Sequence, residues 1–128
     1  MEIEQGKIDK AILETKKIIN KSDNIIFSFI SEYEKERFSG DFEYENYIYL
    51  FTNSFIIGRR IDNTEGLGDN RIVLDIYNIN KLRKHIKVTF FEEKNRMIVD
   101  LGEFKLISTK ENVANLNEIL KHCLLKIE

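Results

Sequence analysis

Proline is absent from the sequence, and its 128 residues include only two histidines and one cysteine. The single thiol, Cys123, excludes a disulfide within the chain, so we expect a reducing compartment and a fold stabilised by its hydrophobic core. No stretch approaches the roughly 20 apolar residues of a membrane-spanning helix, and residues 1–5 lack the basic start of a secretory signal. Together these absences predict a soluble, cytoplasmic protein.

Neither sign of charge is in clear excess. The chain has 20 basic and 22 acidic residues, which gives a formal net charge of -2. The overall charge therefore does not favour binding to nucleic acid or to anionic lipid, and any such binding has to be local. Ile, Asn and Lys are abundant, which is the composition that an AT-rich genome produces and which indicates a bacterial or phage origin.

Residues that carry enzyme chemistry are few and poorly placed. Cys123 directly follows His122, and a helix turns two adjacent side chains about 100° apart. His85 is the other histidine. The acidic loop at residues 62–70 does not match a calcium loop, because Leu67 occupies the place of the required glycine. We therefore expect no catalytic residue, no metal site and no cofactor.

Apolar residues at helical spacing predict an N-terminal helix over residues 3–20. Its inward positions are Ile8, Ala11, Ile12, Thr15, Ile18 and Ile19. Short β-rich segments follow, each bounded by polar or turn-forming residues. They predict strands at residues 24–33, 43–51, 54–61, 71–76, 84–92, 96–101 and 103–107. Thr52-Asn53 and Glu93-Lys94-Asn95 predict tight hairpins, because Asn tolerates the positive φ that such turns require.

A second helix is predicted over residues 109–126. Ser108 and Glu111 have the spacing of a capping box, in which each side chain binds the free backbone N–H of the other residue. An apolar stripe follows, and it comprises Val113, Leu116, Leu120, Cys123, Leu124 and Ile127. Because no proline- or glycine-rich linker interrupts the chain, we expect the helix of residues 1–22 and a domain of residues 23–128 to form one structural unit.

The strand-turn-strand segment from Ile48 to Ile57 resembles part of a known family. Seven short antiparallel strands followed by one amphipathic helix resemble the pleckstrin-homology (PH) superfold, and this segment is similar to the one that opens many bacterial PH-like and GRAM-like domains. The resemblance covers about residues 23–128, although the charged segment at residues 32–41 departs from a minimal form. It implies an α+β fold with a seven-stranded, strongly bent antiparallel sheet or partial barrel and a C-terminal capping helix. It also implies a scaffold that binds lipids, peptides or proteins, and it assigns no functional residue.

The second predicted strand has bulky apolar residues on both faces. Tyr47, Tyr49 and Phe51 point to one side. Ile48 and Leu50 point to the other. A barrel buries only one of these faces, and contiguous exposed aromatic surface marks an interface. We therefore expect the three aromatic residues to be covered by the N-terminal helix or by a second protein chain, which makes them a candidate protein interface.

A basic stripe is predicted near the fifth strand. Its members, which alternate along the chain, are Lys81, Arg83, His85 and Lys87. A strand that begins by residue 82 directs them all outward. Three further residues flank the polar loop and extend this candidate anion-binding surface, namely Arg59, Arg60 and Arg71. It suits a phosphorylated headgroup, a nucleic-acid backbone or an acidic partner, and the alternative is an ordinary solvated face balanced by nearby acidic residues.

These features predict a non-catalytic module that binds another macromolecule, most simply a protein. An immunity protein, a phage-encoded inhibitor and an adaptor all fit a small acidic chain of this kind, and self-association is included. The alternative is a peripheral domain that binds anionic lipid or phosphoinositide through the basic stripe, but balanced charge and the lack of a second membrane anchor count against it. A third hypothesis is a carrier that holds an apolar ligand in the barrel. Nucleic acid is not expected, because no aromatic residues are interleaved with the basic ones.

Overall fold

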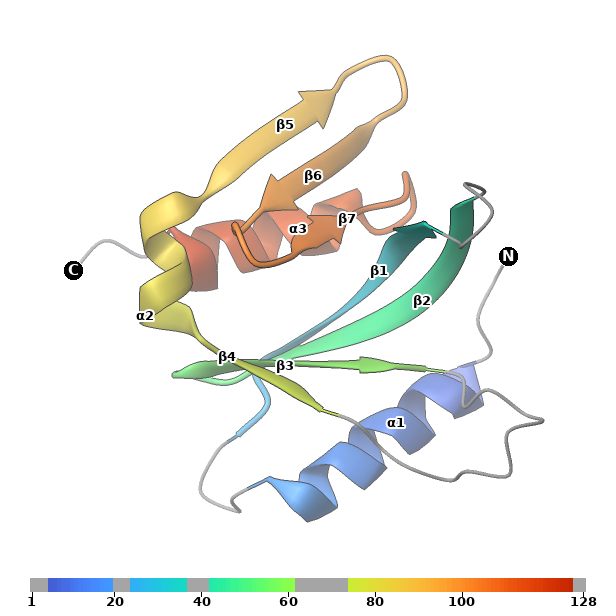
Figure 1. Ribbon diagram of the computed structural model, residues 1–128, viewed down its shortest axis with the longest axis vertical. Helices are drawn as coiled ribbons and strands as arrows, with labels where there is room; N and C mark the ends of the chain where they lie inside the picture. Colours follow the sequence, from blue (N-terminus) through green and yellow to red (C-terminus); the bar gives the residue numbers. More distant parts are fainter. Residues whose placement is uncertain (1–4, 20–23, 37–41, 62–73, 126–128) are drawn as a thin grey trace.

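A computed structural model of the chain describes residues 5–19, 24–36, 42–61 and 74–125. Its elements, in chain order, are α1 (Gln5–Ile18), β1 (Phe27–Glu36), β2 (Phe42–Phe51), β3 (Phe55–Arg60), β4 (Asp75–Asn78), α2 (Ile79–Leu82), β5 (Lys87–Phe91), β6 (Arg96–Asp100), β7 (Lys105–Ile107) and α3 (Val113–Ile119). A 3-10 turn, Arg83–His85, follows α2, and a π-helical segment, Leu120–Leu124, continues α3. The fold is α+β, with two antiparallel sheets in the strand orders β1-β2-β3-β4 and β5-β6-β7 (Figure 1).

All seven predicted strands are present, but they do not form one bent sheet or a partial barrel. The chain leaves the first sheet after β4, because residues 79–85 are helical and not the start of the fifth strand. The side-chain oxygen of Asn78 caps this helix by accepting hydrogen bonds from the backbone N–H groups of Asn80, at 2.9 Å, and Lys81, at 3.4 Å. The early part of the predicted fourth strand, residues 71–73, lies outside the described residues.

The first face of the four-stranded sheet is covered by α1 (Figure 1). Ala11 is buried against Ile48 and Leu50 of β2, and the partly buried side chains of α1 pack around this contact. Ile18, which we expected on the same face, is 55% exposed. Ile18 lies only about 20° from Ala11 around the helix axis, so the helical period does not account for its exposure. It is the last residue of α1, whose buried positions are Ala11 and Thr15.

The second face of the four-stranded sheet packs against α3 and the three-stranded sheet (Figure 1). Tyr49 and Phe51 of β2 meet Val99 of β6 and Leu116 of α3 in one core. The prediction that the N-terminal helix or a second chain covers the aromatic face is therefore wrong. The cover is the C-terminal half of the chain itself, and α1 covers the opposite side of β2.

Of the two predicted hairpin turns, only one uses a positive φ. In the β2–β3 turn the hydroxyl of Thr52 accepts a hydrogen bond from the N–H of Phe55 at 2.9 Å. The N–H of Thr52 donates to the carbonyl of Phe55, also at 2.9 Å. Among the described residues other than glycine, only Asn95, in the β5–β6 turn, has a positive φ, which is 48°. The prediction of positive φ is therefore correct for Asn95 and wrong for Asn53, since Thr52 closes that turn with its side chain.

The C-terminal helix begins later than predicted and without a capping box. Ser108 is buried, and its hydroxyl accepts a hydrogen bond from the N–H of Met97 at 2.8 Å. It is therefore committed to β6, and α3 starts only at Val113. The predicted stripe is otherwise correct, because its members Leu116, Leu120, Cys123 and Leu124 are all buried. Ile127 lies outside the described residues.

Candidate functional site

The aromatic residues predicted as a protein interface lie in the core of the chain. Phe51 has no exposed surface and Tyr49 is 4% exposed, while Tyr47 is partly buried against the same core. The ring of Tyr49 stacks on that of Phe104 with 4.9 Å between the centroids, and the ring of Tyr47 lies 6.2 Å from that of Tyr49. Because the second sheet covers this face, Tyr49 and Phe51 are not available to a partner of the folded chain.

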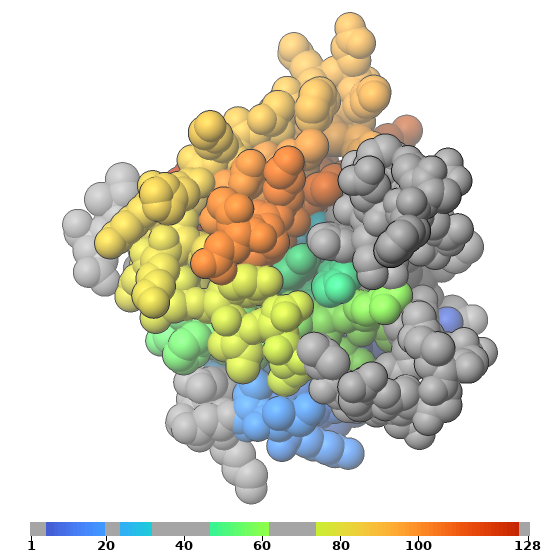
Figure 2. Space-filling model, viewed as in Figure 1, coloured from blue at the N-terminus to red at the C-terminus, as the bar shows by residue number. Residues whose placement is uncertain are grey.

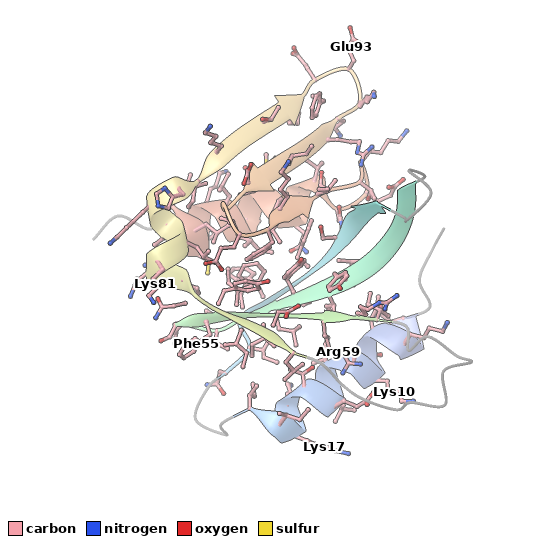
Figure 3. The ribbon with its side chains drawn as sticks, in the orientation of Figure 1. Lys10, Lys17, Phe55, Arg59, Lys81 and Glu93 are labelled. Atoms are coloured by element: carbon pink, nitrogen blue, oxygen red, sulfur yellow. The ribbon has the colours of Figure 1, made fainter. Side chains whose placement is uncertain are left out.

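The predicted basic surface is divided between opposite sides of the four-stranded sheet. Arg59 is buried, with its Nη1 donating to the carbonyl of Ala11 at 3.5 Å and its Nε to that of Arg60 at 3.2 Å. Figure 3 places Arg59 beside α1, well away from Lys81 on α2. Arg60 is partly buried, and Arg71 lies outside the described residues. Arg59 therefore does not extend a surface around Lys81.

Arg83 connects α2 to the end of the C-terminal helix. Its Nη2 donates to the carbonyl of Cys123 at 2.7 Å, and its Nη1 donates to the side-chain oxygen of Asn80 at 2.9 Å. Carbonyl groups at a helix C-terminus carry partial negative charge, so the guanidinium is well placed there. The Nε of Arg83 is buried with no hydrogen-bond partner among the described residues. The geometry thus gives Arg83 a structural contact, not an outward anion-binding position.

The remaining members of the stripe are exposed but do not share a strand face. Lys81 belongs to α2, His85 to the following 3-10 turn and Lys87 to the first position of β5. The prediction that one strand aligns them is wrong, because the cap at Asn78 makes residues 79–85 helical. What remains is a group of exposed basic side chains at the beginning of β5, to which Lys84 also belongs.

Potential metal ligands do not gather in the described part of the chain. No group of three or more His, Cys, Asp or Glu side chains that could hold a metal ion occurs there. The pKa of the exposed Glu111 carboxyl is lowered, first by a hydrogen bond from its own backbone N–H and second by one from the side chain of Thr109.

Among the helices of the described ranges, none has the length and apolar character needed to cross a membrane.

The strand β5 is exposed along its whole length. Each of its five residues is exposed, including Val88 at 43%, Phe90 at 50% and Phe91 at 44%. Figure 2 shows β5 and its turn to β6 forming the upper end of the molecule. Val88 and Phe90, two residues apart, lie on one face of the strand, and exposed apolar side chains that lie together mark interaction sites.

Two of these apolar side chains point to the core side of their sheet. Val88 lies opposite Val99 and Phe90 lies opposite Met97 in the β5–β6 ladder, so each shares a face with its partner. Val99 and Met97 are buried in the core, whereas Val88 and Phe90 are about half exposed. The core therefore fills the space under β6 and does not extend beneath β5.

One edge of β5 carries backbone N–H and carbonyl groups that are not hydrogen-bonded to β6. The N–H of Met97 donates to the Ser108 hydroxyl at 2.8 Å, and its carbonyl accepts from the Ser108 N–H at 2.9 Å, so both groups point towards β7. Phe90, opposite Met97, is then in a non-hydrogen-bonded pair, and its N–H and carbonyl point away from β6. Because the direction of the backbone groups alternates along the strand, the N–H and carbonyl of Val88, two residues earlier, also point away from β6. Neither residue makes another hydrogen bond within the described ranges.

Opposite charges lie at the two ends of β5. Lys84, His85 and Lys87 are exposed at its beginning. Glu92 and Glu93 are exposed just after its end, and Figure 3 shows Glu93 at the tip of the hairpin. Lys94 follows them, so the tip carries two negative charges and one positive charge. The term "β5 edge" below means residues Lys87–Phe91 with these two flanks.

The sequence-based prediction did not select the β5 edge as an interface. The outward basic residues of the predicted strand imply that Val88 lies on its inward face, and the structure agrees, but this inward side chain is exposed. The doublet Phe90-Phe91 was a usable signal, because adjacent residues of a strand point to opposite faces and two aromatic residues therefore occupy both. No family model matches the chain, and neither a curated protein nor a solved structure matches it.

Proposed function

We propose that the chain is a non-catalytic protein-interaction module that binds its partner along the β5 edge. The observation that carries this proposal is that every residue of β5 is exposed and that the backbone groups of Val88 and Phe90 point away from β6. An extended segment of a protein can add a strand to such an edge, where main-chain hydrogen bonds give affinity and alternate side chains give specificity. Edge strands that must stay unpaired are usually protected by charged residues, proline or a bulge. The two residues of β5 whose backbone groups face away from β6 are Val88 and Phe90, which provide no such protection.

We also propose that the scaffold is PH-like. Seven antiparallel strands followed by a C-terminal helix, in that order along the chain, support this assignment. On such a scaffold an immunity protein, a phage-encoded inhibitor or an adaptor each needs one specific protein contact, which the β5 edge supplies. The ligand-carrier hypothesis has lost its basis, since the two sheets do not close into a barrel.

Binding to an anionic lipid surface is the second candidate. The observation in its favour is the group of exposed basic side chains at the start of β5, Lys81, Lys84, His85 and Lys87, next to exposed apolar side chains. Glu92 and Glu93 at the tip of the same hairpin oppose it, because an anionic surface repels them. The geometry therefore favours a protein partner.

Site-specific photo-crosslinking tests the proposal. A benzophenone amino acid replaces Phe90 in one variant and Leu13 in the control, because Leu13 is similarly apolar and 58% exposed but lies on α1. Each variant is irradiated in an extract of cells that naturally express the chain. We expect protein adducts from position 90 and not from position 13. Equal labelling from both positions, or none from position 90, contradicts a protein-binding β5 edge.

A parallel titration examines the second candidate. The wild-type chain is mixed with vesicles of phosphatidylserine and phosphatidylcholine at low salt, and sedimentation measures the bound fraction. We expect no binding. Binding that is lost when Lys84 and Lys87 are both changed to Gln, and that also weakens as salt is added, would instead support the lipid candidate.

A further inference from the structure

We propose that the strand that pairs with the β5 edge is β5 of a second copy of this chain, running antiparallel about a two-fold axis at Thr89. This inference rests on the proposed function, because it names the partner of the same edge. The pairing joins two three-stranded sheets into one continuous sheet across the dimer. A two-fold contact of this kind uses the same surface on both copies, so that surface has to be complementary to itself.

The backbone of β5 satisfies that requirement. Val88 and Phe90 direct their N–H and carbonyl groups outward, whereas Lys87, Thr89 and Phe91 direct theirs to β6. When the axis passes through Thr89, each Val88 lies opposite Phe90 of the second copy. Both members of such a pair exchange two hydrogen bonds, so every outward group of the two strands obtains a partner.

The length of β5 selects this register. An axis through Thr89 pairs all five residues of β5, since Lys87 then lies opposite Phe91. The two neighbouring registers that also pair outward groups with outward groups have their axes at Val88 and at Phe90. They place Phe90 opposite Ile86 and Val88 opposite Glu92, and neither Ile86 nor Glu92 belongs to β5. The Thr89 register also pairs Val88 with Phe90 twice on the core-side face, where both side chains are half exposed in the single chain.

The charges at the two ends of β5 favour the same arrangement. An antiparallel partner brings the basic beginning of one strand near the acidic end of the other. Lys84, His85 and Lys87 of one copy then lie close to Glu92 and Glu93 of the second. A parallel partner places like charges together at each end, which is unfavourable. The edge is thus self-complementary in backbone, apolar surface and charge.

Disulfide trapping tests the register directly. Cys123, the only native cysteine, is first replaced by Ala, and Thr89→Cys is then introduced. At a non-hydrogen-bonded position on the axis the two Cα atoms lie about 4.5 Å apart, which a disulfide can bridge. The control is Phe90→Cys in the same background, since the two copies of residue 90 then lie diagonally at about 7–8 Å. Circular dichroism checks that both variants are folded.

Each variant is oxidised under mild conditions, and the fraction of covalent dimer is measured. We expect Thr89→Cys to form a covalent dimer of twice the 15.2 kDa chain mass and Phe90→Cys to remain monomeric. A dimer from Phe90→Cys alone overturns the Thr89 register. The absence of a dimer from both variants, at protein concentrations up to the limit of solubility, overturns pairing of this strand with itself.

Analytical ultracentrifugation of protein without an introduced cysteine measures the oligomeric state independently. Wild-type protein should show a reversible monomer–dimer equilibrium, and Val88→Pro should lose the dimer, because proline removes an outward N–H. The control Val88→Thr keeps that N–H and a similar shape, so it should still dimerise. A wild-type chain that stays monomeric while position 90 crosslinks to a different protein overturns this inference and leaves the proposed function intact.

Discussion

Gly58 lies directly opposite Tyr49 in the β2–β3 ladder, and the Tyr49 ring occupies the space next to its Cα. A Cβ at residue 58 would lie 2.8 Å from Cε1 of Tyr49. That ring cannot move aside freely, because it is stacked on Phe104 in the core between the two sheets. Gly58 is therefore needed for close approach of an aromatic ring, not for an unusual backbone angle.

Gly58→Ala should consequently destabilise the fold. Overpacking of a filled core typically costs about 1–3 kcal/mol, and we expect a decrease of that size in the free energy of unfolding measured with urea. Gly6→Ala is the matched control, because an added Cβ at Gly6, in α1, meets no atom within 4 Å. The control should be neutral or slightly stabilising. Equal effects of the two substitutions would show that the ring of Tyr49 yields easily.

Arg83→Met should destabilise the chain through loss of the bond to the carbonyl of Cys123. Hydrogen bonds from charged groups contribute about 1.5–3 kcal/mol, and the buried Nε without a partner offsets part of that gain. We therefore expect a loss of about 1–2 kcal/mol in urea unfolding. Lys81→Met, at an exposed position of the adjoining helix, should change stability by less than about 0.5 kcal/mol. A neutral Arg83→Met would contradict a structural role for this guanidinium.

Ser108→Ala tests whether the Ser108 hydroxyl supports β6 and does not cap α3. The substitution leaves the N–H of Met97 without its acceptor in a buried position, which typically costs about 1–3 kcal/mol. Lys110→Ala, at the exposed approach to α3, should change stability by less than about 0.5 kcal/mol. Thermal unfolding of both variants measures the difference. If Ser108→Ala instead frayed α3 while β6 remained protected from hydrogen exchange, a capping role would be restored.

Glu111 should contribute to the acid sensitivity of the fold. Its pKa is lowered in the folded chain by its own backbone N–H and by Thr109, so the ionised form is favoured there. This stabilisation is present above the pKa of the unfolded chain and is lost as the pH falls through the lowered folded value. Glu111→Gln should therefore make stability less dependent on pH in that range. Carboxyl titration by NMR checks the direction, and identical pKa values in folded and urea-unfolded protein would contradict it.

Side-chain periodicity identified the elements well, because burial follows it. The stripe that includes Leu116 and Leu124 was visible in the sequence since those residues lie on one face of a helix and that face is buried. The helix at residues 79–85 was missed, because a short capped turn depends on one side chain, Asn78, and has too few residues for a periodic pattern. Asn78 followed by Ile79 and Leu82 was the available signal.

The location of the candidate interface could not be derived in the same way. A sequence shows that both faces of β2 are apolar, but the partner of each face is decided by how distant segments pack. Likewise, Val88 and Phe90 have the alternation of buried residues, and only the strand order β5-β6-β7 reveals that they lie at an edge beyond the core. Burial at sheet edges is a property of topology, which local pattern does not encode.

Amide hydrogen exchange along β5 tests the central claim most directly. In dilute protein, the amides of Thr89 and Phe91, which face β6, should exchange slowly, and those of Val88 and Phe90 should exchange rapidly. As a partner strand is supplied, by raising the protein concentration or by adding a protein captured at position 90, the amides of Val88 and Phe90 should become protected. Rapid exchange of both amides at every concentration and with every such partner would contradict the account, as would complete protection in protein that sedimentation shows to be monomeric.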